Sequence, residues 1–199
     1  VRCTFNWNYL QTSSSPTDWH FEKTDLILQK AQEYGVNVLG IIVGTPSWLA
    51  KPPNIPPPIA PWKTAVWTIC DRYKEGSAYG EVMAWEIWNE QNTYQSFYSD
   101  DTATYAELLK AAGAAIKQGI PENNPPLPAA NPNAVVVMGG LASYLDPNHP
   151  NSIFNYINDC LSAGVADYID AVAFHVYTTQ LNAVLEPEEA YCCKLVRDV

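Results

Sequence analysis

Short runs of apolar residues alternate along the chain with longer amphipathic runs. The apolar runs are rich in Val, Ile and aromatic residues, and most of them lack strict alternation of polar and apolar positions. Such continuous runs are typical of parallel strands that are covered on both faces. They predict five strands, at residues 2–7, 36–44, 82–88, 134–140 and 169–177.

Each predicted strand is followed by a segment in which apolar residues recur at helical spacing. In the first of these segments, Leu26, Ile27 and Tyr34 lie at helical intervals, and Gly35 provides a C-terminal stop. The last segment begins with two glutamates and ends with basic residues, which suits the helix dipole. The predicted helices are residues 21–34, 62–73, 102–117, 153–163 and 187–197.

This alternation of strands and helices predicts a parallel sheet, either an open doubly wound sheet or a (β/α)-barrel. No Gly-x-Gly-x-x-Gly follows the first strand and the sequence has no phosphate-binding loop, which disfavours a nucleotide-binding sheet. The Pro-rich segment 51–61 follows the second strand and is expected on the strand-carboxyl face, where barrels build active sites. Segment 121–132 is expected on the opposite face, and residues 1–199 are predicted to form one domain.

Composition narrows the possible partners. The chain is 47% hydrophobic and 16% charged, as globular proteins are, and its net charge of −10 disfavours binding to nucleic acid. No apolar run is long enough to span a membrane. The first residues lack a basic region followed by an apolar run, so we expect no signal peptide in this chain. The compartment, extracellular or cytoplasmic, stays open.

One segment carries most of the chemical information, namely Trp-Glu-Ile-Trp-Asn-Glu-Gln-Asn at residues 85–92. Because side chains alternate along a strand, Glu86, Trp88 and Glu90 are expected to share a direction. Glycoside hydrolysis needs one carboxylic acid to protonate the leaving oxygen and a second carboxylate across the sugar. An acid at a strand's carboxyl end, walled by Trp, suits the first role.

The Trp-Asn-Glu sequence at a strand end resembles that of clan A glycoside hydrolases, and most of the chain resembles family 39 with its β-xylosidases. The resemblance implies a (β/α)8 TIM-type barrel. Residues 1–7 resemble the family's second strand, 35–48 its third, 82–90 its fourth, 135–140 its fifth and 170–177 its sixth. Residues 105–110 resemble the helix after the acid/base.

The resemblance also implies roles for particular residues. Glu90 would be the general acid/base of a retaining enzyme, and Asn89 would bind the sugar's 2-hydroxyl. The substrate-binding residues implied in addition are His175, Tyr177, Trp48, Trp7 and Arg2. The family's usual Pro after the acid is Gln91 here, a departure expected to affect the shape of the loop. No metal or cofactor is implied, and the cysteine spacings match no zinc site.

Each of these roles has a structural alternative. Glu90 can begin a helix, and His175 can be a core histidine satisfied by a hydrogen bond. Trp7 and Trp48 can be plain packing at the rim. Glu86 is interpreted as structural, paired with a buried base such as Arg2.

The family's nucleophile Glu ends a seventh strand, for which the sequence shows no counterpart. After residue 177 the acids are Glu186, Glu188, Glu189 and Asp198, none at the end of an apolar strand. We therefore expect an incomplete barrel that lacks strands one, seven and eight, with the nucleophile outside this chain. Its open edges would favour self-association.

The leading hypothesis is a retaining glycosidase that cleaves a β-xyloside or a related β-glycoside, with this chain nearly inactive alone. The alternatives are a barrel that binds carbohydrate without cleaving it, and an interaction fragment that docks through its edges.

Overall fold

The computed structural model describes residues 1–97, 102–144, 146 and 148–175. The strands are β1 (Arg2–Asn6), β2 (Leu39–Val43), β3 (Ala84–Asn89), β4 (Val135–Leu141) and β5 (Ala171–Phe174). The helices are α1 (Trp7–Leu10), α2 (Glu22–Glu33), α3 (Ile59–Arg72), α4 (Thr102–Lys117) and α5 (Ile153–Ser162), with a 3-10 turn η1 (Ala166–Tyr168). The helix predicted over 187–197 lies outside the described residues.

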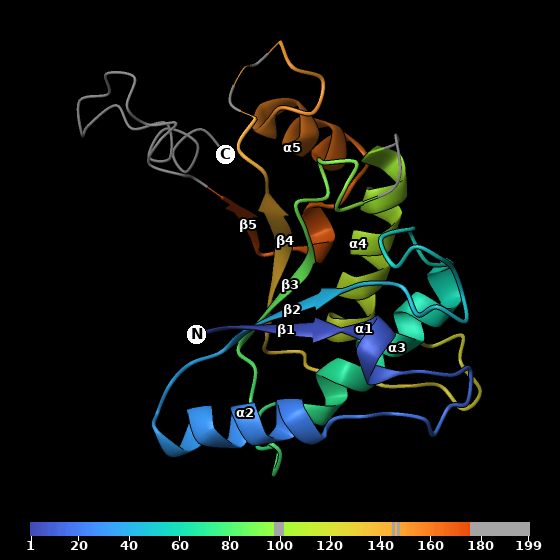
Figure 1. The fold of residues 1–199 in the computed structure, drawn as a ribbon, viewed down its shortest axis with the longest axis vertical. Helices are drawn as coiled ribbons and strands as arrows, with labels where there is room; N and C mark the ends of the chain where they lie inside the picture. The colour runs from blue at the N-terminus through green and yellow to red at the C-terminus, as the bar shows by residue number, and fades with distance from the viewer. Residues whose placement is uncertain (98–101, 145, 147, 176–199) are drawn as a thin grey trace.

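All five strands are parallel, and each pairs with the next strand along the chain, in the order β1-β2-β3-β4-β5 (Figure 1). In register, Thr4 pairs with Ile41, Ile41 with Glu86, and Glu86 with Val137. A doubly wound sheet reverses its strand order at a switch point, and this sheet does not. The strand order is that of a (β/α)-barrel, of which the described residues form an incomplete part, as the sequence predicts.

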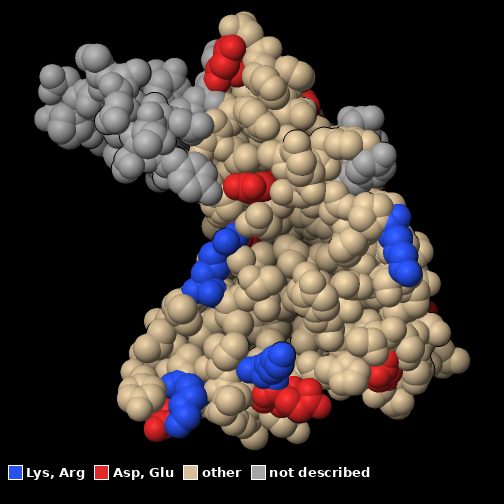
Figure 2. All heavy atoms as spheres, in the orientation of Figure 1, with Lys and Arg blue, Asp and Glu red and all other residues tan. Residues whose placement is uncertain are grey.

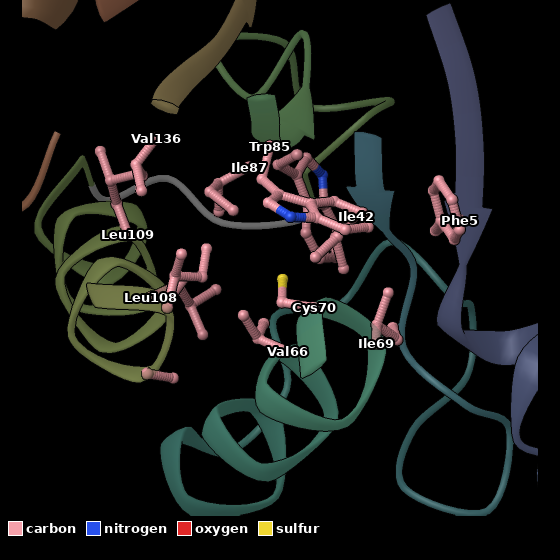
Figure 3. Packing of buried hydrophobic residues seen from close by; sticks show 14 of the residues in the cluster. Phe5, Ile42, Val66, Ile69, Cys70, Trp85, Ile87, Leu108, Leu109 and Val136 are labelled. Atoms are coloured by element: carbon pink, nitrogen blue, oxygen red, sulfur yellow. The ribbon is translucent and has the colours of Figure 1, made fainter. Parts of the chain in front are cut away.

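The core lies between the sheet and the helices α3 and α4, which pack against each other. Figure 3 shows Ile87 and Val136 of the strands facing Leu108 and Leu109 of α4. The Trp85 ring lies over Gly40, where an added Cβ would come within 2.5 Å of it. This close packing requires that neighbouring strands alternate large and small residues on the helix side.

The open face of the sheet is less covered than the helix face. In β1, Cys3 and Phe5 are buried while Arg2 and Thr4 are exposed, so the strand alternates between the two faces. Val135 of β4 is 40% exposed. Figure 2 shows that the described surface is hollowed between the part that carries α5 and the part that carries α2. Within the described sheet, β1 and β5 are the edge strands.

Two elements differ from the sequence-based expectation. Residue 7 was expected to end a strand, but it begins the short helix α1, because Asn6 caps that helix by accepting from the Asn8 amide. In α2 the buried residues are Thr24 and Leu28, whereas Leu26 and Ile27 are 60% and 47% exposed.

No described helix is long and apolar enough to cross a membrane.

Candidate functional site

The backbone changes course at the carboxyl end of β3. Trp88 and Glu90 have φ angles of +71° and +50°, in the left-handed region that side-chain-bearing residues seldom adopt. Trp88 therefore does not share a face with Glu86, contrary to prediction. Its ring is buried on the helix side, edge-on to Trp62 and Phe97, and its Nε1 donates to Ser96 O. Such strain persists only where the surrounding structure holds it.

Glu90 is held from three directions at this strand end. Its backbone N–H donates to Gly140 O at 2.8 Å, and its carbonyl accepts from the Thr93 amide and hydroxyl. Its Oε1 lies 2.8 Å from Nδ1 of His175, the residue after β5. Their side chains are 27% and 23% exposed, so both keep access to solvent. The structure thus brings together two residues that the sequence places 85 positions apart.

The two oxygens of the Glu90 carboxyl group have different surroundings. With a proton on Nδ1, His175 donates to Oε1 whether Glu90 is ionised or carries its own proton on Oε2. Within the described part of the chain, the structure gives Oε2 no hydrogen-bond partner. One oxygen is therefore fixed in place while the other remains open to a ligand.

Asn89 is oriented through Arg2 and Glu86. Arg2 donates from Nε and Nη2 to the two carboxylate oxygens of Glu86, at 3.0 and 2.8 Å, and Nη2 also donates to Asn89 Oδ1 at 2.8 Å. Because the amide oxygen of Asn89 is occupied, its NH2 group is the part left to bind a ligand. Glu86 is 1% exposed and also accepts from the Gly140 amide at 2.7 Å. The predicted pairing of Glu86 with Arg2 is confirmed, but the Arg2 side chain is 40% exposed rather than buried.

Gly140 is a residue that the sequence analysis missed. An added Cβ there would come within 2.5 Å of His175 Nε2 and 2.9 Å of Glu86 Oε1. The Glu86–Arg2 pair and the Glu90–His175 pair therefore both pack against this glycine, where a side chain would leave no room. The adjacent pair Gly139-Gly140 at the end of a predicted strand was the available signal, since consecutive glycines in a strand mark close approach.

The loop after Glu90 is fixed by amide side chains. Gln91 is buried, and its Nε2 donates to Gly139 O at 2.8 Å. Asn92 accepts from the Ala142 amide and donates to the carbonyls of Ala142 and Asn151. The Gln that stands in place of Pro thus ties this loop to β4, which is a packing role.

Trp7 and Trp48 were both predicted to contact the substrate, and only Trp48 lies near the surface. Trp7 is 1% exposed, and its Nε1 donates to Gln11 Oε1, so its ring cannot touch a ligand in this arrangement. Trp48 is partly buried, stands edge-on to Trp7 with ring centroids 6.1 Å apart, and donates to Gln11 O. Trp7 supports Trp48 from behind.

Three further points bound the site. Tyr177 lies outside the described residues. Within the described ranges, no group of three His, Cys, Asp or Glu residues is placed to hold a metal ion. A pocket of about 750 Å³ lies at the amino ends of the strands, between Val1, Leu39, Ala84 and Val135, at the opposite end of the sheet from Glu90.

Several solved structures of glycosidases are similar to this chain. A family 39 β-xylosidase from Caulobacter crescentus is 18% identical, with a TM-score of 0.64 over 89% of this chain. A glucosidase from Croceicoccus marinus is also 18% identical, with a TM-score of 0.61 over 87%. A family 53 catalytic domain from Ignisphaera aggregans is 19% identical, with a TM-score of 0.57 over 88%. The fold is that of a (β/α)-barrel, as in these glycosidases.

The chain spans less than half of each of the compared structures. The chain covers 40%, 36% and 48% of those three structures, respectively. The sequence itself matches no family model and no curated protein. The likeness therefore shows the fold, and the activity is argued from the residues at the end of β3.

Proposed function

We propose that this chain supplies the acid/base half of a retaining β-glycosidase, with Glu90 as general acid/base and β-xylosides or related β-glycosides as substrates. The observation that carries the proposal is the position of Glu90. It lies at the carboxyl end of a barrel strand, with Oε1 held by His175 and Oε2 open. Asn89 lies beside it with its NH2 group available to a sugar hydroxyl.

The nucleophile is proposed to come from outside this chain. Retaining enzymes need a second carboxylate about 5–5.5 Å from the acid, placed to attack the sugar carbon. Glu86 is the acid nearest along β3, but both of its oxygens accept hydrogen bonds and it is buried. A carboxylate fully engaged with a guanidinium is a weak nucleophile. The chain alone is accordingly expected to be nearly inactive.

The test uses the natural protein that carries these residues and two aryl β-xylosides that differ in leaving-group acidity. Glu90→Ala should lower kcat/KM for 4-nitrophenyl β-xyloside by about 10²–10⁴-fold, because that leaving group needs a proton. The loss should be smaller for the 2,4-dinitrophenyl glycoside. Azide should restore turnover and yield a β-glycosyl azide, since a small anion can replace the base in the second step.

The matched control is Glu107→Gln, which removes a carboxylate from the outer surface of α4, where the side chain is 62% exposed. It should leave both rates unchanged. Equal losses on the two substrates, or no rescue by azide, would show that Glu90 is not the acid/base. Sugar binding without turnover by the wild-type protein would favour a barrel that binds carbohydrate without cleaving it.

A further inference from the structure

The loops at the strand-carboxyl face carry a row of accessible aromatic side chains. Tyr9 follows β1, Trp48 follows β2, Tyr94 follows β3 and Tyr144 follows β4. The three tyrosines are 71%, 48% and 37% exposed, and Trp48 is partly buried. Each of four successive strands thus delivers one such ring to the face on which Glu90 lies. Neighbouring loops at one end of the sheet therefore each carry an aromatic ring that a ligand on this face could contact.

The first loops in this row are joined to each other by asparagine side chains. Asn8 Oδ1 accepts from the Ser47 amide at 2.8 Å, which links the loop after β1 to the loop after β2. Asn54 Nδ2 donates to Gln95 O at 2.8 Å, which links the loop after β2 to the loop after β3. Asn8, Ser47 and Gln95 each stand next in sequence to one of the aromatic residues. The rings are therefore mounted on cross-braced loops.

The same construction continues to the loop after β4. Asn92 exchanges hydrogen bonds with both backbone groups of Ala142, two residues before Tyr144. The Tyr144 ring is stacked on His149, with centroids 4.5 Å apart and planes 6° from parallel. Ser143 donates to the carbonyl of His175, the partner of Glu90. Tyr144 is thus fixed in orientation and adjacent in sequence to a residue that contacts the acid pair.

These contacts favour a ligand longer than one sugar ring. Adjacent parallel strands lie about 4.8 Å apart, so the loops of four strands extend over roughly 14 Å. Flat rings fixed at intervals along such a rim are suited to the apolar C–H faces of successive sugar rings, and ordering them in advance reduces the entropy lost on binding. A single small glycoside would use only the ring nearest Glu90.

We propose that Tyr9, Trp48, Tyr94 and Tyr144 bind successive residues of an oligosaccharide, so that the substrate is a sugar chain of several units. The proposal rests on the proposed function in placing the cleaved bond at Glu90. It adds the substrate class, because it assigns the remaining loops to subsites on both sides of that bond.

Binding to the chain itself tests this inference without requiring turnover. The probes are xylohexaose and xylobiose, with cellohexaose and mannohexaose in parallel, titrated calorimetrically into the Glu90→Gln form so that no probe is consumed. We expect one hexasaccharide to bind at least about tenfold more tightly than the disaccharide of the same sugar. Tyr9→Ala and Tyr144→Ala should each weaken hexasaccharide binding about three- to tenfold.

The matched control is Tyr34→Ala. It removes a tyrosine about as exposed as Tyr9 from the end of α2, which precedes the amino end of β2 and so lies away from the strand-carboxyl face. It should leave the affinity within about twofold. Circular dichroism of each variant should match the parent, because the altered side chains are exposed. Equal affinity for long and short probes, no binding of any hexasaccharide, or an equal loss in Tyr34→Ala would overturn the proposal.

This outcome is separable from that of the proposed function. Tight hexasaccharide binding by a natural protein that cleaves no glycoside would overturn the acid/base role and leave the oligosaccharide rim standing. Cleavage of aryl xylosides without preference for long chains would do the reverse.

Discussion

The middle and the carboxyl end of β3 each carry a glutamate, and the two are used differently. Glu86 is 1% exposed and accepts hydrogen bonds from Arg2 and from the Gly140 amide on both of its oxygens. Glu90, four residues later, accepts from His175 on one oxygen and is 27% exposed. The number of donors around each carboxylate, rather than the residue type, decides which one is available for chemistry.

The largest effect on stability is expected from Glu86→Gln. The substitution removes a buried negative charge from beside Arg2 and places an amide where the guanidinium and the Gly140 N–H need acceptors. Because Arg2 keeps 40% of its side chain in solvent, the cost is set at about 2–3 kcal/mol, below that of a fully buried pair. Glu90→Gln should cost less than about 0.5 kcal/mol. Urea unfolding of both variants measures the difference, and equal costs would remove the distinction between the two acids.

Gly140→Ala should affect both glutamates at once. The added methyl would meet His175 Nε2 and Glu86 Oε1 inside normal contact distance, so at least one side chain must move. We expect about 1–3 kcal/mol of destabilisation, typical of overpacking. Gly164→Ala is the comparison, since its Cβ would meet nothing within 4 Å, although its φ of +80° adds backbone strain. If the two variants unfolded at the same urea concentration, crowding at Gly140 would not be the cause of its loss.

His175→Asn should affect activity more than stability. The substitution removes the group that holds Oε1, so Glu90 gains rotamer freedom and is less often aimed at the leaving oxygen. In the natural protein we expect kcat to fall about tenfold while KM and the urea midpoint change little. An unchanged kcat with a large loss of stability would identify His175 as a packing residue.

The smallest effect concerns Asp25, a third carboxylate, which like Glu86 is structural and which extends the comparison to the helices. Burial opposes its ionisation, but hydrogen bonds from Arg72 and Tyr73 and the Arg72 charge outweigh this and lower the pKa of Asp25. A depressed folded-state pKa stabilises above the unfolded-state value, and the stabilisation is lost as pH falls through the folded-state pKa. Asp25→Asn should therefore flatten the loss of stability as the pH falls below the unfolded-state pKa of an aspartate, about 3.9, by less than about 1 kcal/mol. Parallel acid titrations of wild type and variant measure it.

The sequence predicts the strands well because continuous apolar runs are a strong signal. The alternation of strands and helices then limits the possible topologies to a few. It predicts the faces of α2 poorly. The pattern favoured Leu26 and Ile27, yet Leu28 is the apolar residue of α2 that is buried, and Asp25, three residues before it, pairs with Arg72 of α3. A tertiary ion pair that sets a helix's rotation is invisible to local periodicity.

The site divides in the same way. The pairing of Glu86 with Arg2 follows from sequence, because a buried acid in a strand needs a base as its partner, whereas the role of Glu90 rests on the Trp-Asn-Glu resemblance and stays a proposal. The position of Trp88 does not follow from sequence, since alternation assumes regular φ angles and this residue departs from them. The hydrogen bond from His175 to Glu90 confirms only their proximity, which parallel strand ends predict; the roles of Asn89, His175 and Trp48 stay proposals.

The order of the strands has a consequence for how the chain folds. Each strand pairs with its successor, so every new strand adds to an edge that has already formed, and no segment must be threaded between earlier ones. During synthesis, β1 to β4 can assemble before β5 leaves the ribosome. The ion pair between Arg2 of β1 and Glu86 of β3 can form as soon as β3 has joined the sheet. The contact of Glu90 with His175 must come last, so the part of the site that faces the ligand is completed after the scaffold beneath it.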